Sequence, residues 1–381
     1  MRILLISNLW PPHILGGAEV YTEMLGDRLA AAGHEVGAIT LGYDGERVVA
    51  TVPAWPYPPH TLREQPVWKR LLAHSADMYR PGAAKAIRAA AEDFQPDVVH
   101  TNTVQGFSIA ALMAPAGPDV GHLHTMHDYW LLCARTNLRH RHPETCGPPC
   151  AAIRRLRRRL LERHPPDEIT SLSQAVFDEH DARGVHLKGS RRSVIMLPVE
   201  RITGAPPERP DRPVVFGFIG QVNPNKGIKT LVEAFTKAAI PGSTLRVAGR
   251  GRLQEIVTGR EQESIIYDGF VSDLQKEQFF ADIDCMVMPS EWPEPSGTVI
   301  NEAKARGLPV LGARAGGIPE YVPVASQPLL YPSGDVDGLV ESMRAVADDR
   351  KRYAPVPSDL DHDWDDHLVR IGGAYERVVR R

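Results

Sequence analysis

Short apolar runs alternate with segments of helical spacing along the start of the chain. Met1–Asn8 is an apolar run of strand length, and Glu35–Thr40 is a second one. Between them, apolar residues recur at the spacing of one helix face, namely Val20, Met24, Leu25 and Leu29. Gly33 ends this helix pattern. The pattern predicts a β-α-β unit with parallel strands.

The same alternation continues to about residue 200. An Ala-rich helix is predicted over Arg80–Phe94 and another helix around Ser108–Ala114. Buried strands are predicted at Asp97–His100, Gly121–Thr125, Glu168–Ser173 and Ser193–Leu197. Five prolines between Thr51 and Pro66 predict a loop without regular structure. Alternating strands and helices predict a doubly wound α/β sheet.

A proline-rich linker, Pro198–Pro213, precedes a second α/β segment that begins at Val214. Its helix is expected over Ile228–Lys237, and its strands lie within Val214–Gly220, Thr244–Gly251, Ile265–Val271 and Cys285–Met288. The last amphipathic helix, Asp363–Val379, is expected to pack back on the first domain. We therefore predict an N-terminal domain over residues 1–200, a C-terminal domain over 201–360 and a terminal helix over 361–381.

Two carboxylates frame the segment where the strand Cys285–Met288 turns through a Pro/Gly-rich loop into a helix. Backbone N–H groups at Gly297 and Thr298 start this helix, and its dipole favours a phosphate there. Glu302 lies four residues after Thr298, so its carboxylate shares a helix face with the phosphate-binding end. Glu294 lies in the loop just before. Two hydroxyl-accepting carboxylates around an anion site suit a nucleotide sugar, and ordinary helix capping is the alternative.

Other candidate residues of the first domain also follow predicted strands. Gly16 and Gly17 lie where the first strand turns into a helix, where backbone N–H groups can approach a phosphate or sugar. A merely tight turn is the alternative. His127 follows a strand at the sheet edge where open α/β folds bind ligands, and it could donate to a sugar hydroxyl or satisfy a neighbouring backbone group.

The second domain repeats this arrangement of loops after strands. Lys226 precedes a helix and could pair with a diphosphate, although a surface lysine before a glycine turn has the same spacing. The loops at Gly249 and at Phe270–Val271 also follow strands and could hold a base.

Charge and composition exclude several classes of protein. The 381 residues contain 44 Lys+Arg and 47 Asp+Glu, a net charge of -3, which predicts no nucleic-acid partner. No apolar run approaches the ~20 residues of a membrane span, and the N-terminal run lacks a signal-peptide cleavage site, so a cytoplasmic location is expected. Cys133, Cys146 and Cys150 could form a structural zinc site with nearby histidines, or remain free thiols.

Nine arginines lie between Arg135 and Arg163. The predicted helix there has an apolar stripe of Ile153, Leu156, Leu160 and Leu161, opposite Arg154, Arg155, Arg157, Arg158 and Arg159. A basic amphipathic helix over Arg154–Arg163 could lie on the anionic inner face of a membrane or meet an acidic acceptor. A solvated face over a core stripe is the simpler alternative.

Taken in order, these motifs resemble the retaining glycosyltransferases of family 4, whose GT-B fold has two Rossmann-like domains facing across a cleft. The most specific segment is Glu294–Ala303, which is similar to the family's E-P-x-G-x-x-x-x-E-A motif. Further matches follow in the family's order: Gly16–Glu19, His127-Asp128, Gly220 with Lys226-Gly227, Gly249–Gly251, Pro289-Ser290, Gly307–Val310 and Gly316–Glu320.

The resemblance implies a role for each candidate residue. Glu294 and His127 would contact the donor sugar, and Lys226 would neutralise the leaving phosphate. The implied donor-binding residues are Glu302 at the ribose, Gly297, Thr298 and Val299 at the diphosphate, Phe270 and Val271 at the base, and Gly249 and Gln221 in the neighbouring loops. Gly16 and Gly17 would face the acceptor or the distal phosphate. Many relatives have arginine where this chain has Gln221, so that cation is missing or is supplied by another residue.

We therefore expect a hexosyltransferase-type enzyme that moves a sugar from a nucleoside diphosphate sugar to an acceptor hydroxyl with retention. The acceptor would be a glycan, a glycolipid or a natural product, and the resemblance implies neither a metal nor a cofactor. A GT-B sugar epimerase or phosphorylase is one alternative. A non-catalytic nucleotide-sugar or membrane-surface binding module is the other. The pattern leaves the donor base, the sugar, the acceptor and the oligomeric state open.

Overall fold

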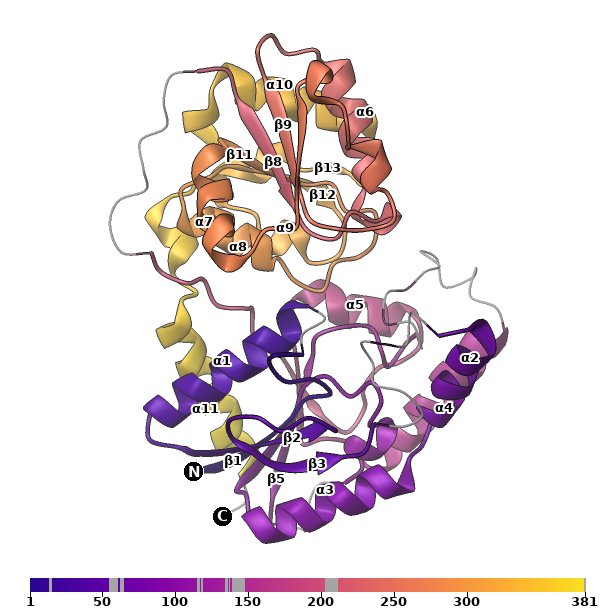
Figure 1. Ribbon diagram of the computed structural model, residues 1–381. Helices are drawn as coiled ribbons and strands as arrows, with labels where there is room; N and C mark the ends of the chain where they lie inside the picture. The colour runs from indigo at the N-terminus through magenta and orange to yellow at the C-terminus, as the bar shows by residue number, and fades with distance from the viewer. Residues whose placement is uncertain are drawn as a thin grey trace. The chain divides into compact units, whose positions relative to one another are not determined.

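The chain forms two compact units in the computed structural model (Figure 1). The structure describes residues 1–13, 16–54, 61, 65–114, 117, 119–133, 136, 138, 148–202 and 212–379. Unit 1 comprises Met1–Ile195 with Leu368–Arg381, and unit 2 comprises Met196–His367. The sequence predicts domain boundaries after residues 200 and 360. In the structure, the chain passes from one unit to the other after residues 195 and 367.

A seven-stranded sheet organises the described part of unit 1. Its strands are β1 (Arg2–Ile6), β2 (Glu35–Leu41), β3 (Val48–Val52), β4 (Val98–Thr101), β5 (Gly121–Met126), β6 (Glu168–Ser171) and β7 (Arg191–Val194). They lie in the order β3-β2-β1-β4-β5-β6-β7, and every neighbouring pair is parallel. This is the doubly wound order, and the direction of winding reverses between β1 and β4.

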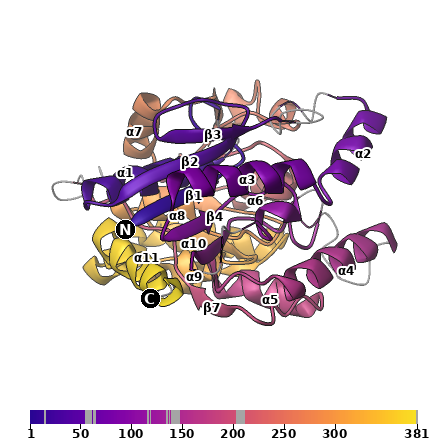
Figure 2. The same cartoon turned by 90° about the horizontal axis from the view of Figure 1, so that it is seen from below.

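Helices flank this sheet and bury its apolar strands. They are α1 (Gly17–Ala31), α2 (Val67–Ala76), α3 (Pro81–Phe94), α4 (Pro148–Arg163), α5 (Gln174–Ala182) and the C-terminal part of α11 (Trp364–Val378). Figure 2 shows α11 beside the start of the chain. The Tyr375 hydroxyl lies 2.9 Å from His100 Nδ1, and Arg377 donates to both carboxylate oxygens of Glu168. These contacts hold the end of α11 against the first sheet.

Two elements of unit 1 differ from the sequence prediction. Thr51 and Val52 belong to strand β3, which pairs with β2, so the predicted loop is wrong for these two residues. The first of the prolines, Pro53, comes directly after the end of β3. Residues 55–60 and 62–64 of the predicted loop lie outside the described part. The helix predicted around Ser108–Ala114 is a single 3₁₀ turn over Ile109–Ala111. Ser108 precedes the turn with a φ of 71°, and its side chain accepts a hydrogen bond from the Ala110 N–H. The turn spans only three residues, a length typical of 3₁₀ segments.

Helix α4 does not have the faces that its sequence predicts. Arg157 is 1 % exposed, and its guanidinium lies 3.6 Å from the centre of the Trp130 ring. It also donates to the Trp130 carbonyl and lies 3.8 Å from Asp77. These contacts offset the cost of burying the cation. Leu156, predicted as core, is 43 % exposed, so one arginine of the predicted basic face has replaced a leucine in the interior.

A six-stranded parallel sheet organises the described part of unit 2. Its strands are β8 (Val215–Ile219), β9 (Thr244–Ala248), β10 (Ile265–Gly269), β11 (Cys285–Met288), β12 (Val310–Arg314) and β13 (Tyr331–Pro332). Their order, β10-β9-β8-β11-β12-β13, repeats the doubly wound arrangement, with the reversal between β8 and β11. The expected fold class, with two Rossmann-like sheets, is therefore confirmed.

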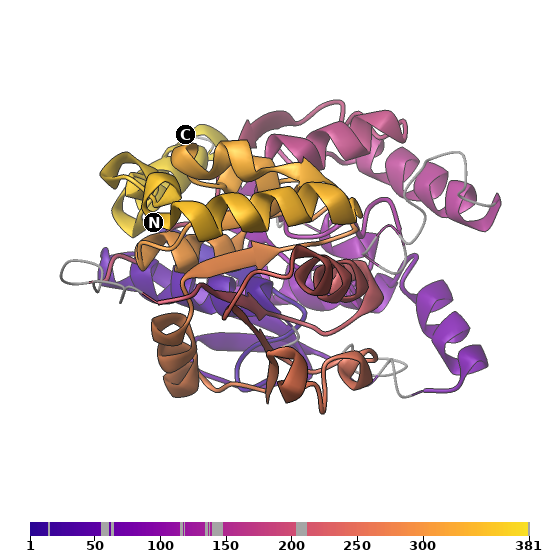
Figure 3. The same ribbon diagram turned by 90° about the horizontal axis from the view of Figure 1, so that it is seen from above.

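The helices of unit 2 cover both faces of its sheet. They are α6 (Ile228–Ala238), α7 (Asp273–Asp282), α8 (Thr298–Ala305), the short α9 (Ile318–Tyr321) and α10 (Val336–Asp348). Figure 3 shows α6 alongside α10, and these two helices pack together. Among the residues described in both units, no helix is both long enough and apolar enough to cross a bilayer.

Candidate active site

The reversal between β8 and β11 places a lysine beside a buried carboxylate. Lys226 follows β8, Glu294 follows β11, and these two strands are neighbours. Lys226 Nζ lies 2.6 Å from Glu294 Oε1, and the Ser290 hydroxyl donates to the same oxygen at 2.5 Å. Glu294 is only 5 % exposed. Ligands bind at such reversals in open α/β sheets, so this pair occupies the expected position for a binding site.

The backbone around this pair is held by close contacts between loops. Gly227 has a φ of +71°, and a Cβ added there would lie 1.8 Å from the Pro289 carbonyl oxygen. Only glycine allows the Lys226 loop to approach the Pro289 loop so closely. On the other side, the Gly317 N–H donates to the Glu294 carbonyl at 2.7 Å. The loop that carries Glu294 is therefore fixed from both sides.

Helix α8 begins directly after this loop, with Gly297 as its N-cap. The first backbone N–H groups of a helix have no partner within the helix, and they point out of its N-terminus. Thr298 and Val299 supply two of these groups, and Thr298 is exposed. The predicted diphosphate-binding residues thus lie at the same sheet edge as Lys226 and Glu294.

Glu302 lies in the second turn of α8 and forms an ion pair with Lys276 of α7 through its Oε1 atom. Its other oxygen, Oε2, is buried and has no hydrogen-bond partner among the described residues. A buried carboxylate oxygen without a donor is costly, so it is suited to accept from a ligand hydroxyl. Sequence reasoning missed Lys276, because it lies on a different helix and nothing in its spacing links it to Glu302.

Four further predicted residues lie in loops at the same edge. Gly249 has a φ of +131°, and a Cβ there would lie 1.8 Å from the Gly220 carbonyl oxygen, so these two loops pack backbone to backbone. Phe270 is 60 % exposed, and the Arg250 guanidinium lies 5.2 Å from the centre of its ring. Val271, the next residue, is partly exposed. Gln221 is exposed, and its side-chain oxygen accepts from Asn223 at 3.1 Å.

His127 and the glycine pair lie in unit 1. His127 follows β5, is 9 % exposed, and lies 2.9 Å through its Nε2 atom from Asn102 Oδ1. Tyr21, in the second turn of α1, contacts His127 with ring centres 5.1 Å apart, and burial raises the pKa of this tyrosine. Helix α1 starts at Gly17, and the Gly16 N–H donates to Glu19 at 2.9 Å. The predicted residues of unit 1 therefore meet around the first turns of α1.

Asp128, next to His127, belongs to a buried charged cluster with Asp77 and Arg157. Burial raises the pKa of Asp128 and that of Asp77 to about 6 each, and it lowers the pKa of Arg157 to about 10. Trp130 links the group, because its indole N–H donates to Asp77 at 2.6 Å and its backbone N–H donates to Asp128 at 2.7 Å. This cluster fixes the backbone just after His127.

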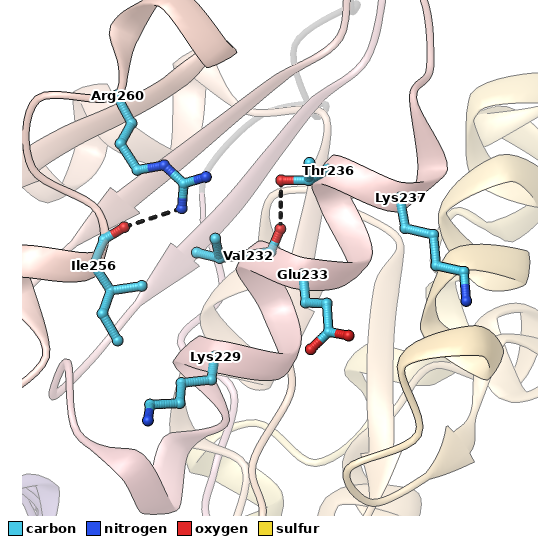
Figure 4. Close-up of a pocket in the computed structure, with 7 residues that line it drawn as sticks. All are labelled: Lys229, Val232, Glu233, Thr236, Lys237, Ile256 and Arg260. Atoms are coloured by element: carbon cyan, nitrogen blue, oxygen red, sulfur yellow. Dashed lines mark hydrogen bonds between the residues drawn. The ribbon is translucent and has the colours of Figure 1, made fainter.

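A shallow pocket of about 520 Å³ lies along the outer face of α6 (Figure 4). Its lining contains Lys229, Lys237 and Arg260. Lys237 pairs with Asp337, and Arg260 pairs with Glu263 and donates to the Ile256 carbonyl. Two of the three cations are therefore neutralised, and the polar groups do not converge on one point. We do not assign the site to this pocket.

No cluster of three or more His, Cys, Asp or Glu side chains suited to a metal occurs in the part of the chain that the structure describes. Cys133 is a free thiol, and so is the buried Cys285. The side chains of Cys146 and Cys150 lie outside the described residues, and with them the predicted alternative of a zinc site.

Comparisons with known proteins identify the family of the chain. The model of "Glycosyltransferase Family 4" matches residues 15–195, and that of "Glycosyl transferases group 1" matches residues 202–357. An uncharacterized 42.6 kDa protein in the cps region of Klebsiella pneumoniae is 26% identical over 84% of this chain and 87% of its own length. A glycogen synthase of Mycobacterium tuberculosis is 27% identical over 96% of this chain and 92% of its own length.

Solved structures show the same fold. Anabaena HepE in complex with UDP has a TM-score of 0.70 and 20% identity, over 99% of this chain and 100% of that one. The same protein has also been solved with UDP-glucose, with a TM-score of 0.66. The two family models match successive parts of the chain, each with its own doubly wound sheet. The chain therefore belongs to the family-4, group-1 glycosyltransferases and has the GT-B fold.

Proposed function

We propose that this glycosyltransferase moves a hexose from a nucleoside diphosphate sugar to an acceptor hydroxyl, with retention of anomeric configuration. The observation that carries the proposal is the cluster at the reversal of the second sheet. There Lys226, the buried Glu294 and the N-terminus of α8 lie at one sheet edge. The nucleotide complexes of the Anabaena structural neighbour support a nucleoside diphosphate as the leaving group.

The cluster supplies the interactions that departure of a diphosphate requires. Negative charge grows on the diphosphate as its bond to the sugar breaks, and fixed positive groups stabilise that charge. The Lys226 ammonium and the first N–H groups of α8 provide such groups without a metal. Glu302 Oε2, which lacks a partner among the described residues, would accept from the ribose hydroxyls.

Retention follows if the acceptor attacks from the face that the diphosphate leaves. The sugar–phosphate bond breaks, the acceptor oxygen bonds to the anomeric carbon, and the acceptor proton passes to a phosphate oxygen of the leaving group. Glu294 would hold a hydroxyl of the donor sugar, and His127 would contact the sugar near the reacting carbon. In this scheme the protein acts by positioning and by electrostatics.

Two outcomes would favour the alternative functions. A pyridoxal cofactor that colours the purified protein would indicate a phosphorylase, and turnover without an acceptor would indicate an epimerase. Binding of nucleotide sugars without any turnover would indicate a binding module. The proposal instead expects a colourless protein that releases nucleoside diphosphate only when an acceptor is present, and that keeps its activity in EDTA.

A thermal-shift panel of nucleoside diphosphates is the first experiment. A ligand that binds the folded protein raises Tm with its concentration, so one base that stabilises the protein more than the others identifies the donor class. UDP, ADP, GDP and TDP would be compared at equal concentration. Failure of all of them to shift Tm would contradict the proposal. If UDP gives the largest shift, UDP-glucose and UDP-galactose are the next donors to be tested, by the release of UDP in the presence of an acceptor.

The proposal keeps the expected cytoplasmic location and a peripheral membrane contact through α4. Arg155, Arg159 and Arg163 are exposed, while Arg157 is buried and can make no such contact. The exposed Leu156 adds an apolar group beside these cations. Cations around an apolar residue suit the interface of an anionic membrane.

A further inference from the structure

Asn102 lies at the reversal of the first sheet, directly after β4 and beside β1. It is 2 % exposed, and its backbone N–H donates to the Ile6 carbonyl at 2.9 Å. Its side-chain nitrogen donates to the His100 carbonyl at 3.3 Å. Because the amide nitrogen is used in this way, the amide oxygen faces His127. The orientation of the Asn102 side chain therefore follows from its own hydrogen bonds.

This orientation determines which nitrogen of His127 carries the proton. Asn102 Oδ1 lies 2.9 Å from His127 Nε2, and an amide oxygen can only accept. Nε2 must therefore be the protonated nitrogen that donates. In the neutral ring the proton is then absent from Nδ1, which carries a lone pair. The ring can accept a hydrogen bond through Nδ1 and cannot donate one there.

We infer that Asn102 is a positioning residue that holds His127 in its Nε2–H tautomer, so that Nδ1 accepts a hydrogen bond from a hydroxyl of the donor sugar. This inference rests on the proposed function and reverses the direction of the hydrogen bond that the sequence suggests, in which His127 could donate to a sugar hydroxyl. An acceptor at this position holds a sugar hydroxyl by its proton and leaves the hydroxyl oxygen free to accept from elsewhere. In the opposite tautomer, Nδ1 would carry the proton and could not accept a hydrogen bond from that hydroxyl.

The surroundings of Asn102 favour a rigid orientation of the imidazole. The neighbouring Thr103 hydroxyl donates to Asn8 Oδ1 at 2.7 Å and lies 2.9 Å from the Ser7 hydroxyl. Tyr21 packs against the His127 ring from α1. The His127 ring is thus contacted by Asn102, which follows β4, and by Tyr21 of α1.

The tautomer can be measured on the free protein, so this test does not depend on the proposed function. Long-range proton–nitrogen correlation spectra of protein with isotope-labelled histidine distinguish the two ring nitrogens, and comparison with His127→Gln assigns the signal. We expect Nε2–H in the wild type and in Asn102→Asp, whose carboxylate still accepts. In Asn102→Leu we expect a mixture or a shift to Nδ1–H. Nδ1–H in the wild type, or no change in Asn102→Leu, would overturn the inference.

Kinetics with UDP-glucose as the donor probe, in the presence of an acceptor that supports turnover, test the consequence for catalysis. Asn102→Leu should lower kcat for release of UDP by about tenfold, the effect of losing one hydrogen bond, while KM changes less than about threefold. Thr101→Val is the matched control, because Thr101 is equally buried and contacts His122 and His124 instead of His127. It should keep kcat within about twofold. Equal losses in both variants, or normal kcat in Asn102→Leu, would refute the positioning role.

The two tests separate the inference from the proposed function. If the wild type releases no UDP from UDP-glucose and binds no nucleoside diphosphate, the proposed function fails while the tautomer result still stands. If the wild type is active and Asn102→Leu changes neither the tautomer nor kcat, only the role of Asn102 fails. Tm values for both variants show that each is folded at the assay temperature.

Discussion

The Lys226 ammonium and the Glu294 carboxylate lie 2.6 Å apart, although 68 positions separate these residues in the sequence. The contact exists because β8 and β11 are neighbours in the sheet. It partly neutralises Lys226 before any donor arrives and holds both side chains in place. A bound diphosphate would then share the lysine with Glu294, so the two residues should contribute differently to binding and to turnover.

Lys226→Met should weaken nucleoside diphosphate binding. The variant removes a cation that would form a charge-assisted hydrogen bond to phosphate, so we expect Kd for UDP to rise by about 10- to 100-fold. Lys229→Met is the control, because Lys229 is an exposed lysine in the first turn of α6, the helix that follows Lys226. Isothermal titration calorimetry measures both variants. An equal loss of affinity in Lys226→Met and Lys229→Met would show that only overall charge matters.

Glu294→Gln should instead lower turnover. Glutamine keeps the size of the side chain but removes the charge that pairs with Lys226, so kcat should fall by about 10- to 100-fold. Affinity for UDP should stay within about threefold or improve, since a negative charge near the diphosphate is lost. Glu291→Gln is a nearby control, because Glu291 accepts from Thr230 and not from Lys226. Unchanged kcat in Glu294→Gln would remove this residue from the catalytic site.

The buried strands were predictable because parallel strands covered on both faces have continuous apolar sequences. Leu4 and Val99 are examples, each almost fully buried in strands that the sequence indicates. Strand β3 was missed because only its last residue, Val52, is buried and because the strand lies next to the prolines. Arg157 was misplaced because a buried arginine depends on Trp130 and Asp77, whose proximity no helical pattern reveals.

The places of the candidate residues at strand ends were predictable one by one, but the contacts between them were not. Lys226 and Glu294 follow strand ends, which the sequence indicates, whereas their contact depends on the order of the strands. Asn102 could have been found, because it follows the apolar strand β4 as His127 follows β5, with polar neighbours on both sides. Lys276 carries no such signal, since it lies within a helix.

Lys276→Met should leave Glu302 without its ion pair and raise Kd for UDP. We expect an increase of about 3- to 10-fold, because Glu302 would lose its orientation but keep its charge. Glu302→Gln removes a charged acceptor, and a larger loss of about 10- to 100-fold is expected. Calorimetry with UDP measures both variants, and Lys229→Met again serves as the charge control. A Lys276→Met variant that binds more weakly than Glu302→Gln would indicate that Lys276 contacts the nucleotide itself.

Membrane contact through α4 predicts different effects for neighbouring arginines. Arg155→Glu with Arg159→Glu should reduce binding to vesicles that contain anionic lipid by about tenfold or more, with Tm nearly unchanged. Arg157→Met should instead lower the free energy of unfolding by about 3 kcal/mol or more, because it leaves Asp77 buried without its cation. Vesicle sedimentation and urea unfolding measure these effects. Equal vesicle binding by the charge-reversed variant would exclude this surface.

Acid should destabilise the protein through its buried histidines. Burial lowers the pKa of His122 and of His180 to about 4, and that of His124 to about 3, from 6.5. The folded state then binds fewer protons than the unfolded state between about pH 4 and pH 6.5. The stabilisation is fully present above pH 6.5 and is lost as the pH falls through this window. Over its full titration, each group contributes about 3 to 5 kcal/mol.

The two aspartates Asp77 and Asp128 act in the opposite direction. The pKa values of Asp77 and Asp128 rise from 3.8 to about 6, so their contribution to stability decreases as the pH rises between these values. Three histidines oppose two aspartates, and we expect the free energy of unfolding to be lower at about pH 5 than at about pH 7.5.

Urea unfolding at these two pH values measures the net effect, and two variants separate the contributions. His180→Gln removes one titrating ring and should make the loss of stability in acid smaller. Asp128→Asn removes an opposing carboxyl group and should make that loss larger, because less of the histidine effect is cancelled. Greater stability at about pH 5 than at about pH 7.5 in the wild type would show that the aspartates dominate. The cluster around Asp77 and Asp128, more than the histidines of β5 and α5, would then set the acid response.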